Sequence, residues 1–229
     1  MAYVVGIDGC KEAWISVSME TDSRHLFWNK HYLLSDLLTQ METVKIVGID
    51  IPIGLPEKGP RACDIKARRL LEKRGSSVFP APVQAVLGAK DYKNACDVRF
   101  GIEGKKMSQQ AWAIVPKVGE IDLLLRQRPE YRHVLYEVHP EVSFYFMGNN
   151  KPNRYSKKKR LGMDERIEKL FPFFQISGDY VRAIRHEYRT SEDDIVDALA
   201  ALWSAERILH GEGVVLQEDG STEGPRIYA

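Results

Sequence analysis

Two aspartates follow the same short pattern in distant parts of the sequence. The stretch "VVGIDGC" (residues 4–10) contains Asp8, and "IVGIDIPIG" (residues 46–54) contains Asp50. Each aspartate ends an apolar, β-branched run that is typical of a buried strand. If the two strands are parallel neighbours, both carboxylates reach one edge of a sheet, where their repulsion favours a bound cation. Hard oxygen ligands of this kind favour Mg²⁺ or Mn²⁺.

A helix near the end of the sequence offers more carboxylates. In "SEDDIVDALAALWSAERILHG" (residues 191–211), Asp194 and Asp197 are three residues apart and share a helix face. Asp193 and Asp197 are four apart and can also share one. A stripe of small residues runs along nearly the same face and predicts close packing on the sheet: Ala198, Ala201 and Ala205.

Capping is the alternative interpretation of the first aspartates in this helix. Ser191 is a suitable N-cap, and Asp193 or Asp194 suits the positive end of the helix. Capping does not explain Asp197, which lies beyond the first turn. We therefore predict that Asp194 and Asp197 join Asp8 and Asp50 as metal-binding and catalytic residues.

Two further residues are candidates for the same edge of the sheet. In "EVHPE", Glu137 is a candidate fifth ligand, and His139 could move a proton or bind metal. Alternatively, both side chains satisfy backbone groups in the turn before Pro140. For substrate binding the candidates are Lys157 and Lys158 from the basic run "SKKKR", and Lys11 from the first turn.

The hydrophobic pattern predicts an α/β protein. The pattern indicates three antiparallel strands at residues 3–8, 13–19 and 25–32, followed by a helix within 34–44 and a strand at 45–50. A further strand is expected to end near Glu137. A helix that connects two strands of one sheet implies that the first and fourth strands are parallel. This order is that of a ribonuclease H-like, five-stranded mixed sheet, with three antiparallel strands plus two parallel ones, flanked by helices.

Residues 52–104 differ from the rest because they are rich in proline and glycine around one basic helix. We interpret them as a helical and loop insertion without an apolar core of its own, within a single domain that covers residues 1–229. Residues 107–127 form another predicted helix, which Pro116 should kink or break.

Composition excludes several classes of protein. The 229-residue chain has a formal net charge of +1, so any affinity for nucleic acid needs a local basic patch. Three widely spaced cysteines indicate reduced thiols and a cytoplasmic location. No apolar run is long enough to cross a membrane. The oligomeric state, including a homodimer, stays open.

Seven ordered motifs resemble an uncharacterised bacterial and archaeal family of predicted ribonuclease H-like nucleases. They span residues 4 to about 207 and read "GIDGCKEAW", "GIDIPIGLP", "RACDIKARRLL", "SSVFPAP", "YEVHPEVSF", "SKKKRLG" and "DDIVDALAALW". The last motif also resembles the final helix of the bacterial Holliday-junction resolvase. This resemblance implies that Asp8, Asp50, Asp194 and Asp197 form a metal tetrad, although the resolvase has glutamate where this sequence has Asp50.

These observations predict a nuclease that depends on Mg²⁺ or Mn²⁺ and hydrolyses phosphodiester bonds of DNA or RNA by a two-metal mechanism. One alternative is a non-catalytic module that binds nucleic acid or protein, which the near-neutral charge favours. Another is a phosphotransferase similar to sugar kinases and related ATPases. No second glycine-rich phosphate loop follows residue 130, which argues against that alternative.

Overall fold

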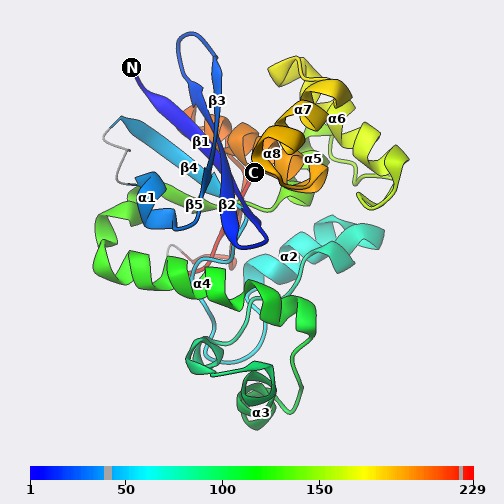
Figure 1. The fold of residues 1–229 in the computed structure, drawn as a ribbon. Helices are drawn as coiled ribbons and strands as arrows, with labels where there is room; N and C mark the ends of the chain where they lie inside the picture. Colours follow the sequence, from blue (N-terminus) through cyan, green and yellow to red (C-terminus); the bar gives the residue numbers. More distant parts are fainter. Residues whose placement is uncertain (39–42, 222–223) are drawn as a thin grey trace.

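A five-stranded mixed sheet forms the centre of the protein (Figure 1). The computed structural model describes residues 1–38, 43–221 and 224–229. The strand order is β3-β2-β1-β4-β5, with β1 antiparallel to β2, β2 antiparallel to β3, and parallel pairing of β1 with β4 and of β4 with β5. The strands are β1 (Tyr3–Cys10), β2 (Ala13–Glu20), β3 (Leu26–His31), β4 (Val44–Ile49) and β5 (Leu135–Glu137). The predicted mixed sheet is therefore confirmed.

The two parallel strands β1 and β4 carry the repeated Gly-Ile-Asp pattern in register. Gly6 pairs with Gly48, and Ile7 pairs with Ile49. Strand β1 continues to Cys10, so Asp8 lies inside the strand, opposite Ile15 of β2, and not at its end as we expected. The antiparallel pairing with β2 prolongs β1 past the point where its parallel partner β4 ends.

Helices cover both faces of the sheet (Figure 1). The apolar cluster on one face joins the sheet to α5–α8, and the cluster on the other face joins it to α1 and α4. The helices on the first face are α5 (Pro140–Met147), α6 (Arg160–Phe174), α7 (Gly178–Tyr188) and α8 (Glu192–Leu209). Those on the second face are α1 (Leu34–Leu38) and α4 (Gln109–Gln127). Met41, which we placed in the first helix, lies outside the described residues.

The inserted segment contains short helices beside the sheet. They are α2 (Ala62–Leu70), the 3₁₀ helices η1 (Glu72–Ser77) and η2 (Gln84–Gly88), and α3 (Tyr92–Glu103). We expected this segment to lack an apolar core of its own, and its buried residues pack in clusters that it shares with other elements. Val83, Val86 and Ala95 form a small buried cluster, because the N-terminal half of α4 supplies apolar partners such as Val115.

Helix α4 continues through Pro116 as one element, so the predicted break does not occur. Proline removes one helical hydrogen bond. Buried residues on both sides of it, such as Val115 and Val118, pack against neighbouring elements and offset that loss.

The remaining elements complete the chain around the sheet. A 3₁₀ helix η3 (Pro129–His133) precedes β5, and β6 (Val215–Leu216) pairs with β7 (Ile227–Tyr228). In the described part of the chain, no helix combines the length and the apolar character needed to cross a bilayer.

Candidate active site

The Gly-Ile-Asp pattern places two carboxylates beside each other on one face of the sheet. Side chains alternate between faces along a strand, so a glycine and the aspartate two residues later point the same way. Asp8 therefore lies on the face of Gly6, and Asp50 continues the face of Gly48. The backbone N–H of Asp50 donates to the carbonyl oxygen of Ile7 at 3.0 Å, which holds the end of β4 against β1.

The glycines bring helix α8 close to the strands. A Cβ atom added at Gly6 would lie 2.1 Å from the carbonyl oxygen of Ala198, and one at Gly48 would lie 2.5 Å from that of Ala201. No side chain fits in these gaps. The small residues of α8 thus meet glycines on the sheet, as the alanine stripe predicted. This close packing brings Asp197, one residue before Ala198, to the edge where Asp8 and Asp50 lie.

The first turn of α8 is a capping box. The Ser191 hydroxyl accepts from the N–H of Asp194 at 3.1 Å, and Oδ2 of Asp194 accepts from the N–H of Ser191 at 2.9 Å. The same Oδ2 also accepts from the hydroxyl of Thr190. Asp194 is therefore used as a capping residue, which is the alternative that its position allowed.

Lys157 is the cation that contacts the aspartates of α8. Its Nζ lies 2.5 Å from Oδ2 of Asp197 and 2.7 Å from Oδ2 of Asp193. Asp193 and Asp197 are four residues apart and share a helix face, as their spacing allowed. Asp193 is therefore a further carboxylate beside the cluster. The charge of Asp194 also raises the pKa of Asp8.

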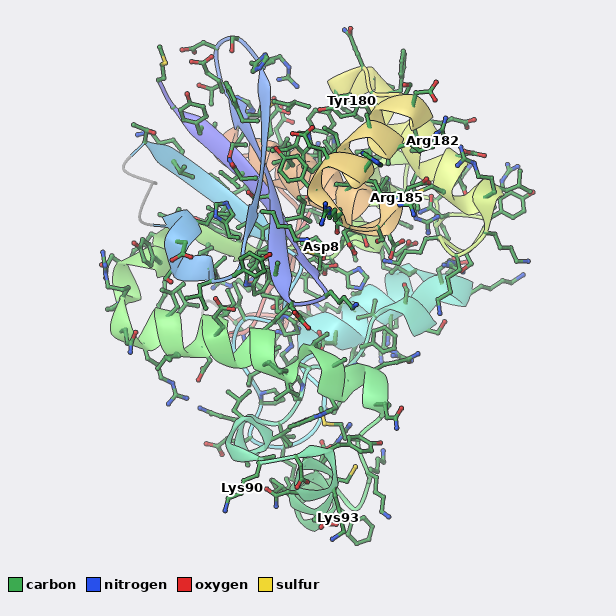
Figure 2. All side chains as sticks on the ribbon, in the orientation of Figure 1. Asp8, Lys90, Lys93, Tyr180, Arg182 and Arg185 are labelled. Carbon is green, nitrogen blue, oxygen red and sulfur yellow. The ribbon has the colours of Figure 1, made fainter. Side chains whose placement is uncertain are left out.

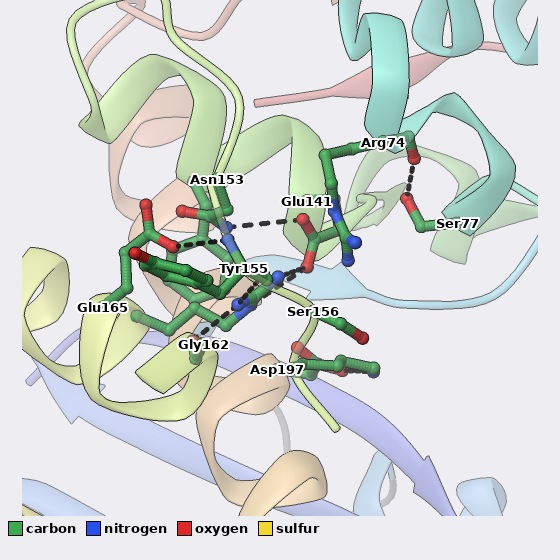
Figure 3. A network of polar contacts seen from close by, with 12 residues as sticks. Arg74, Ser77, Glu141, Asn153, Tyr155, Ser156, Gly162, Glu165 and Asp197 are labelled. Carbon is green, nitrogen blue, oxygen red and sulfur yellow. Dashed lines mark hydrogen bonds and ion pairs between the residues drawn. The ribbon is translucent and has the colours of Figure 1, made fainter. Parts of the chain in front are cut away.

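A network of polar contacts fixes the loop that carries Lys157 (Figure 3). Arg166, which is fully buried, donates from Nη1 to the carbonyl oxygens of Tyr155 and Gly162 at 3.2 and 2.6 Å. It also binds Oε1 of Glu141, with Nε at 3.0 Å. Tyr155 and Gly162 lie on either side of Lys157 in the chain. Their contacts with Arg166 therefore hold the backbone that carries the Lys157 ammonium.

The carboxylates of the site are difficult to ionise together. Burial raises the pKa of Asp8 well above its usual range, and the nearby charges of Asp50 and Asp197 raise it further. Burial also raises the pKa of Asp50 and that of Asp197 to about 7, although Lys157 lowers both. For Lys157, burial lowers the pKa, but the charges of Asp197 and Asp193 outweigh it and the net direction is upward.

These carboxylates lie in a cavity of about 430 Å³. Asp8, Asp50 and Asp197 line it together with two basic side chains from the predicted loop, Lys157 and Lys158. Lys117 of α4 enters from the other face of the sheet, where its Nζ donates to the carbonyl oxygen of Ala13 at 2.6 Å. The inserted segment and the residues after β5 form further walls, which include Arg74, Ser77, Phe79 and His139.

His139 is the member of "EVHPE" that the fold brings to the cavity with Glu141. Burial lowers the pKa of His139, so its imidazole is neutral near pH 7. Its Nδ1 is buried without a hydrogen-bond partner among the described residues. Glu141 is bound by Arg166, and its Oε2 accepts from Nδ2 of Asn153 at 3.3 Å.

Glu137 is not brought to the other carboxylates. Arg61 holds it with a bidentate contact, with distances of 2.6 and 2.7 Å, and the N–H of Ile53 donates to it at 2.6 Å. Arg61 also binds Asp64, so these three buried side chains satisfy one another. Glu137 therefore stabilises the inserted segment against β5, and the predicted fifth ligand lies outside the cavity lining.

The other basic residues have different positions. Lys11 is exposed in the turn between β1 and β2 and does not line the cavity. Figure 2 shows Lys90 and Lys93 at the far end of the inserted segment, well away from Asp8. Arg182 and Arg185, on α7, form ion pairs with Asp179 and Glu192.

Our predicted site residues did not include Lys117 and Arg74, which line the cavity, or Asp193, which contacts Lys157 beside it. Asp193 had the correct spacing from Asp197 but was interpreted as a cap. Lys117 stands at a kink-prone position next to Pro116, and no local pattern connects it with Asp8. Arg74 lies in the inserted segment, where its sequence neighbours indicate only a basic surface.

Carboxylates and one ammonium meet in this arrangement, and only part of the negative charge is paired. In the described residues, no three His, Cys, Asp or Glu side chains are already arranged as a metal-binding group. Lys157 binds Oδ2 of Asp197. No hydrogen-bond donor among the described residues contacts the carboxylates of Asp8 and Asp50. The donor set fits a hard divalent cation at Asp8, Asp50 and Asp197 once the ammonium shifts from Asp197.

The fold and the cavity define an α/β protein with a five-stranded mixed sheet and an acidic site at the ends of its central parallel strands. The chain belongs to the family described as "Protein of unknown function (DUF429)", whose profile matches residues 6–221. No curated protein and no solved structure is significantly similar to the chain.

Proposed function

We propose that this protein is a divalent-metal-dependent nuclease built on a ribonuclease H-like fold. The observation that carries the proposal is the convergence of Asp8, Asp50 and Asp197 from two parallel strands and one helix into a single cavity. Buried carboxylates that repel one another destabilise a protein unless a cation or a proton compensates them. The strand order β3-β2-β1-β4-β5, with α8 packed across β1 and β4, supports the fold assignment.

The residues suit phosphodiester hydrolysis. Mg²⁺ or Mn²⁺ would supply Lewis-acid stabilisation of the phosphate and an acidified water. Asp8, Asp50 and Asp197 would hold the cation. Lys158, which lines the cavity and is exposed, is free to contact a phosphate oxygen, and Lys157 can do so when it leaves Asp197. His139, neutral near pH 7, can accept a proton at Nδ1.

The direct test is cleavage of labelled single-stranded and duplex DNA and RNA with Mg²⁺ or Mn²⁺. We expect Asp8→Asn to reduce cleavage to background while the circular dichroism spectrum and thermal midpoint show a folded protein. The matched control is Asp179→Asn, because Asp179 is exposed on α7, and this variant should cleave like wild type. Undiminished cleavage by folded Asp8→Asn would overturn the assignment.

A second candidate function has one specific observation in its favour. Lys157 already compensates Asp193 and Asp197 without any metal, as in a site that is structural. The protein would then be a binding module on the same fold. Oligonucleotide binding that is unchanged by a metal chelator, together with no cleavage of any of the four substrates, would favour this candidate over the nuclease.

A further inference from the structure

The cavity has a second wall whose chemistry is unlike that of the carboxylates. Residues from Arg74 to Phe79, at the end of η1, line the same cavity as Asp8 and Asp50. They contribute a guanidinium, two hydroxyls and an aromatic ring. None of these groups is a carboxylate, and the guanidinium is positively charged. A bound molecule would place a phosphate at the carboxylates. This wall therefore suits a different part of the same molecule.

Arg74 has unused capacity for hydrogen bonding. Its Nε is buried and has no partner within the described residues. Glu141, which lies beside Arg74 in Figure 3, is already bound by Arg166 and Asn153. Two guanidinium groups thus share one carboxylate, which leaves positive charge at the cavity wall. Nδ1 of His139 is a second buried polar atom on this wall without a described partner.

Phe79 is exposed although its surroundings are fixed. Its exposed fraction is 47%, and it lines the cavity. Nη1 of Arg68 donates to the carbonyl oxygen of Val78 at 2.6 Å, and Oδ2 of Asp64 accepts from the N–H of Ala81 at 3.1 Å. The chain is therefore held on both sides of Phe79. An exposed ring on a held backbone, beside a basic group, is a combination that suits stacking on unpaired bases.

The size of the cavity limits the form of the substrate. Its volume of about 430 Å³ falls within the usual range for small-ligand pockets, about 300–1,000 Å³. The carboxylates on its floor are largely buried, with Asp8 at 8% and Asp197 at 3% exposed. We therefore expect this pocket of small-ligand size to take one nucleotide of a strand more readily than an intact double helix.

We propose that Arg74 and Phe79 form a nucleotide subsite, so that the substrate is a single strand of nucleic acid. In this arrangement Phe79 stacks on an unpaired base, and Arg74 binds the phosphate next to the one that faces the carboxylates. The proposal rests on the proposed nuclease function, because that function defines which phosphate faces the carboxylates. It adds the class of substrate and the residues that select it.

The test measures binding separately from cleavage. The probe is a fluorescein-labelled single strand of about 12 nucleotides, compared with the duplex of the same sequence. Fluorescence anisotropy is recorded with Ca²⁺, and cleavage is recorded in parallel with Mg²⁺ or Mn²⁺. The variants are Arg74→Gln and Phe79→Leu. Their controls are Lys73→Gln, an exposed neighbour that does not line the cavity, and Phe100→Leu, an exposed ring on α3.

We expect wild type to bind the single strand more tightly than the duplex. Arg74→Gln and Phe79→Leu should each weaken single-strand binding by about tenfold, and both controls should stay within about twofold. Arg74→Lys, which keeps the charge but not the fork of donors, should lie between wild type and Arg74→Gln. This variant also covers the case in which Arg74→Gln does not fold.

The outcomes separate the two proposals. Cleavage of duplex and single strand alike, with Arg74→Gln and Phe79→Leu unchanged, would overturn the nucleotide subsite and leave the nuclease assignment standing. Selective weakening of single-strand binding in these variants without any cleavage would support the subsite and overturn the nuclease assignment. Equal weakening in the controls would overturn the subsite, because the effect would then come from general surface charge.

Discussion

Two groups of buried charges in this protein differ in how completely they are satisfied. Around Arg61, one guanidinium makes paired contacts with both Asp64 and Glu137, and Ile53 adds a backbone donor. Around Asp197, one ammonium serves Asp193 and Asp197, while Asp8 and Asp50 face the cavity. The first group is closed and holds the inserted segment to β5. The second group leaves Asp8 and Asp50 without an ion-pair partner in the described residues, and it opens into the cavity.

The difference indicates which group is available for chemistry. A buried ion pair with all its hydrogen bonds made has no capacity left for a ligand. A cluster with excess negative charge gains free energy from any cation that enters it. Four experiments test this difference, and they follow in order of decreasing expected effect.

The largest effect on stability is expected at the closed group. Arg61→Met leaves Asp64 and Glu137 buried without their cation, and breaking such a pair costs about 3–5 kcal/mol. Urea unfolding should show this decrease in the free energy of unfolding. The control is Arg99→Met, which breaks an ordinary pair between neighbouring turns of α3 with Glu103. A decrease no larger than in that control would mean that the Arg61 group does not hold the segment.

The open group should make the metal-free protein less stable as pH rises. Because the folded-state pKa values of Asp50 and Asp197 are raised to about 7, the folded state binds more protons than the unfolded state between about pH 4 and 7. Stability is therefore lost over that window, by on the order of a few kcal/mol. Thermal melts in chelator at a series of pH values measure the loss.

Asp8→Asn is the control for this pH dependence, because it removes one of the mutually repelling charges. It should flatten the pH profile. Mn²⁺ should raise the melting temperature more at about pH 8 than at about pH 5, since the cation replaces the protons. A metal-free protein whose stability rises with pH over this range would contradict the raised pKa values.

Replacing the internal cation should strengthen metal binding. In Lys157→Gln, Asp197 loses its ammonium partner and a positive charge leaves the cavity. We expect about tenfold tighter binding of Mn²⁺, which corresponds to about 1.4 kcal/mol. Lys158→Gln is the matched control, since Lys158 lines the same cavity but has no ion pair with these aspartates in the described residues. Weaker metal binding in Lys157→Gln would show that Lys157 supports the cation site.

The smallest effect is expected at Asp194. Asn at this position can still accept the N–H of Ser191, so Asp194→Asn should change stability by less than about 1 kcal/mol. Cleavage should stay close to the wild-type level if capping is its role. By contrast, a loss as large as that of Asp197→Asn would place Asp194 among the metal-binding residues after all.

The sequence predicts the site where local patterns are strong. The Gly-Ile-Asp repeat and its parallel register were sufficient to place Asp8 next to Asp50, because side-chain alternation and strand order follow from simple rules. The alanine stripe likewise predicted how α8 approaches the strands. Asp197 follows from that packing.

The sequence could not show which side chains far apart in the chain contact each other. Glu137 and Arg61 are 76 residues apart, and nothing near Glu137 indicates that a guanidinium will take it. The run that contains Lys157 suggests a solvated or phosphate-binding loop. Arg166 holds that loop through the carbonyl oxygens of Tyr155 and Gly162, and Lys157 then reaches α8. The choice between Asp193 and Asp194 as partners of Asp197 also depends on that loop.

Calorimetric titration of Mn²⁺ into wild type, Asp197→Asn and Lys157→Gln tests the central claim most directly, namely that the open carboxylate group is a cation site. We expect Mn²⁺ to bind to wild type, not to bind to Asp197→Asn, and to bind more tightly to Lys157→Gln, with all three proteins folded. Absence of binding in both wild type and Lys157→Gln, or equal binding in all three, would contradict it.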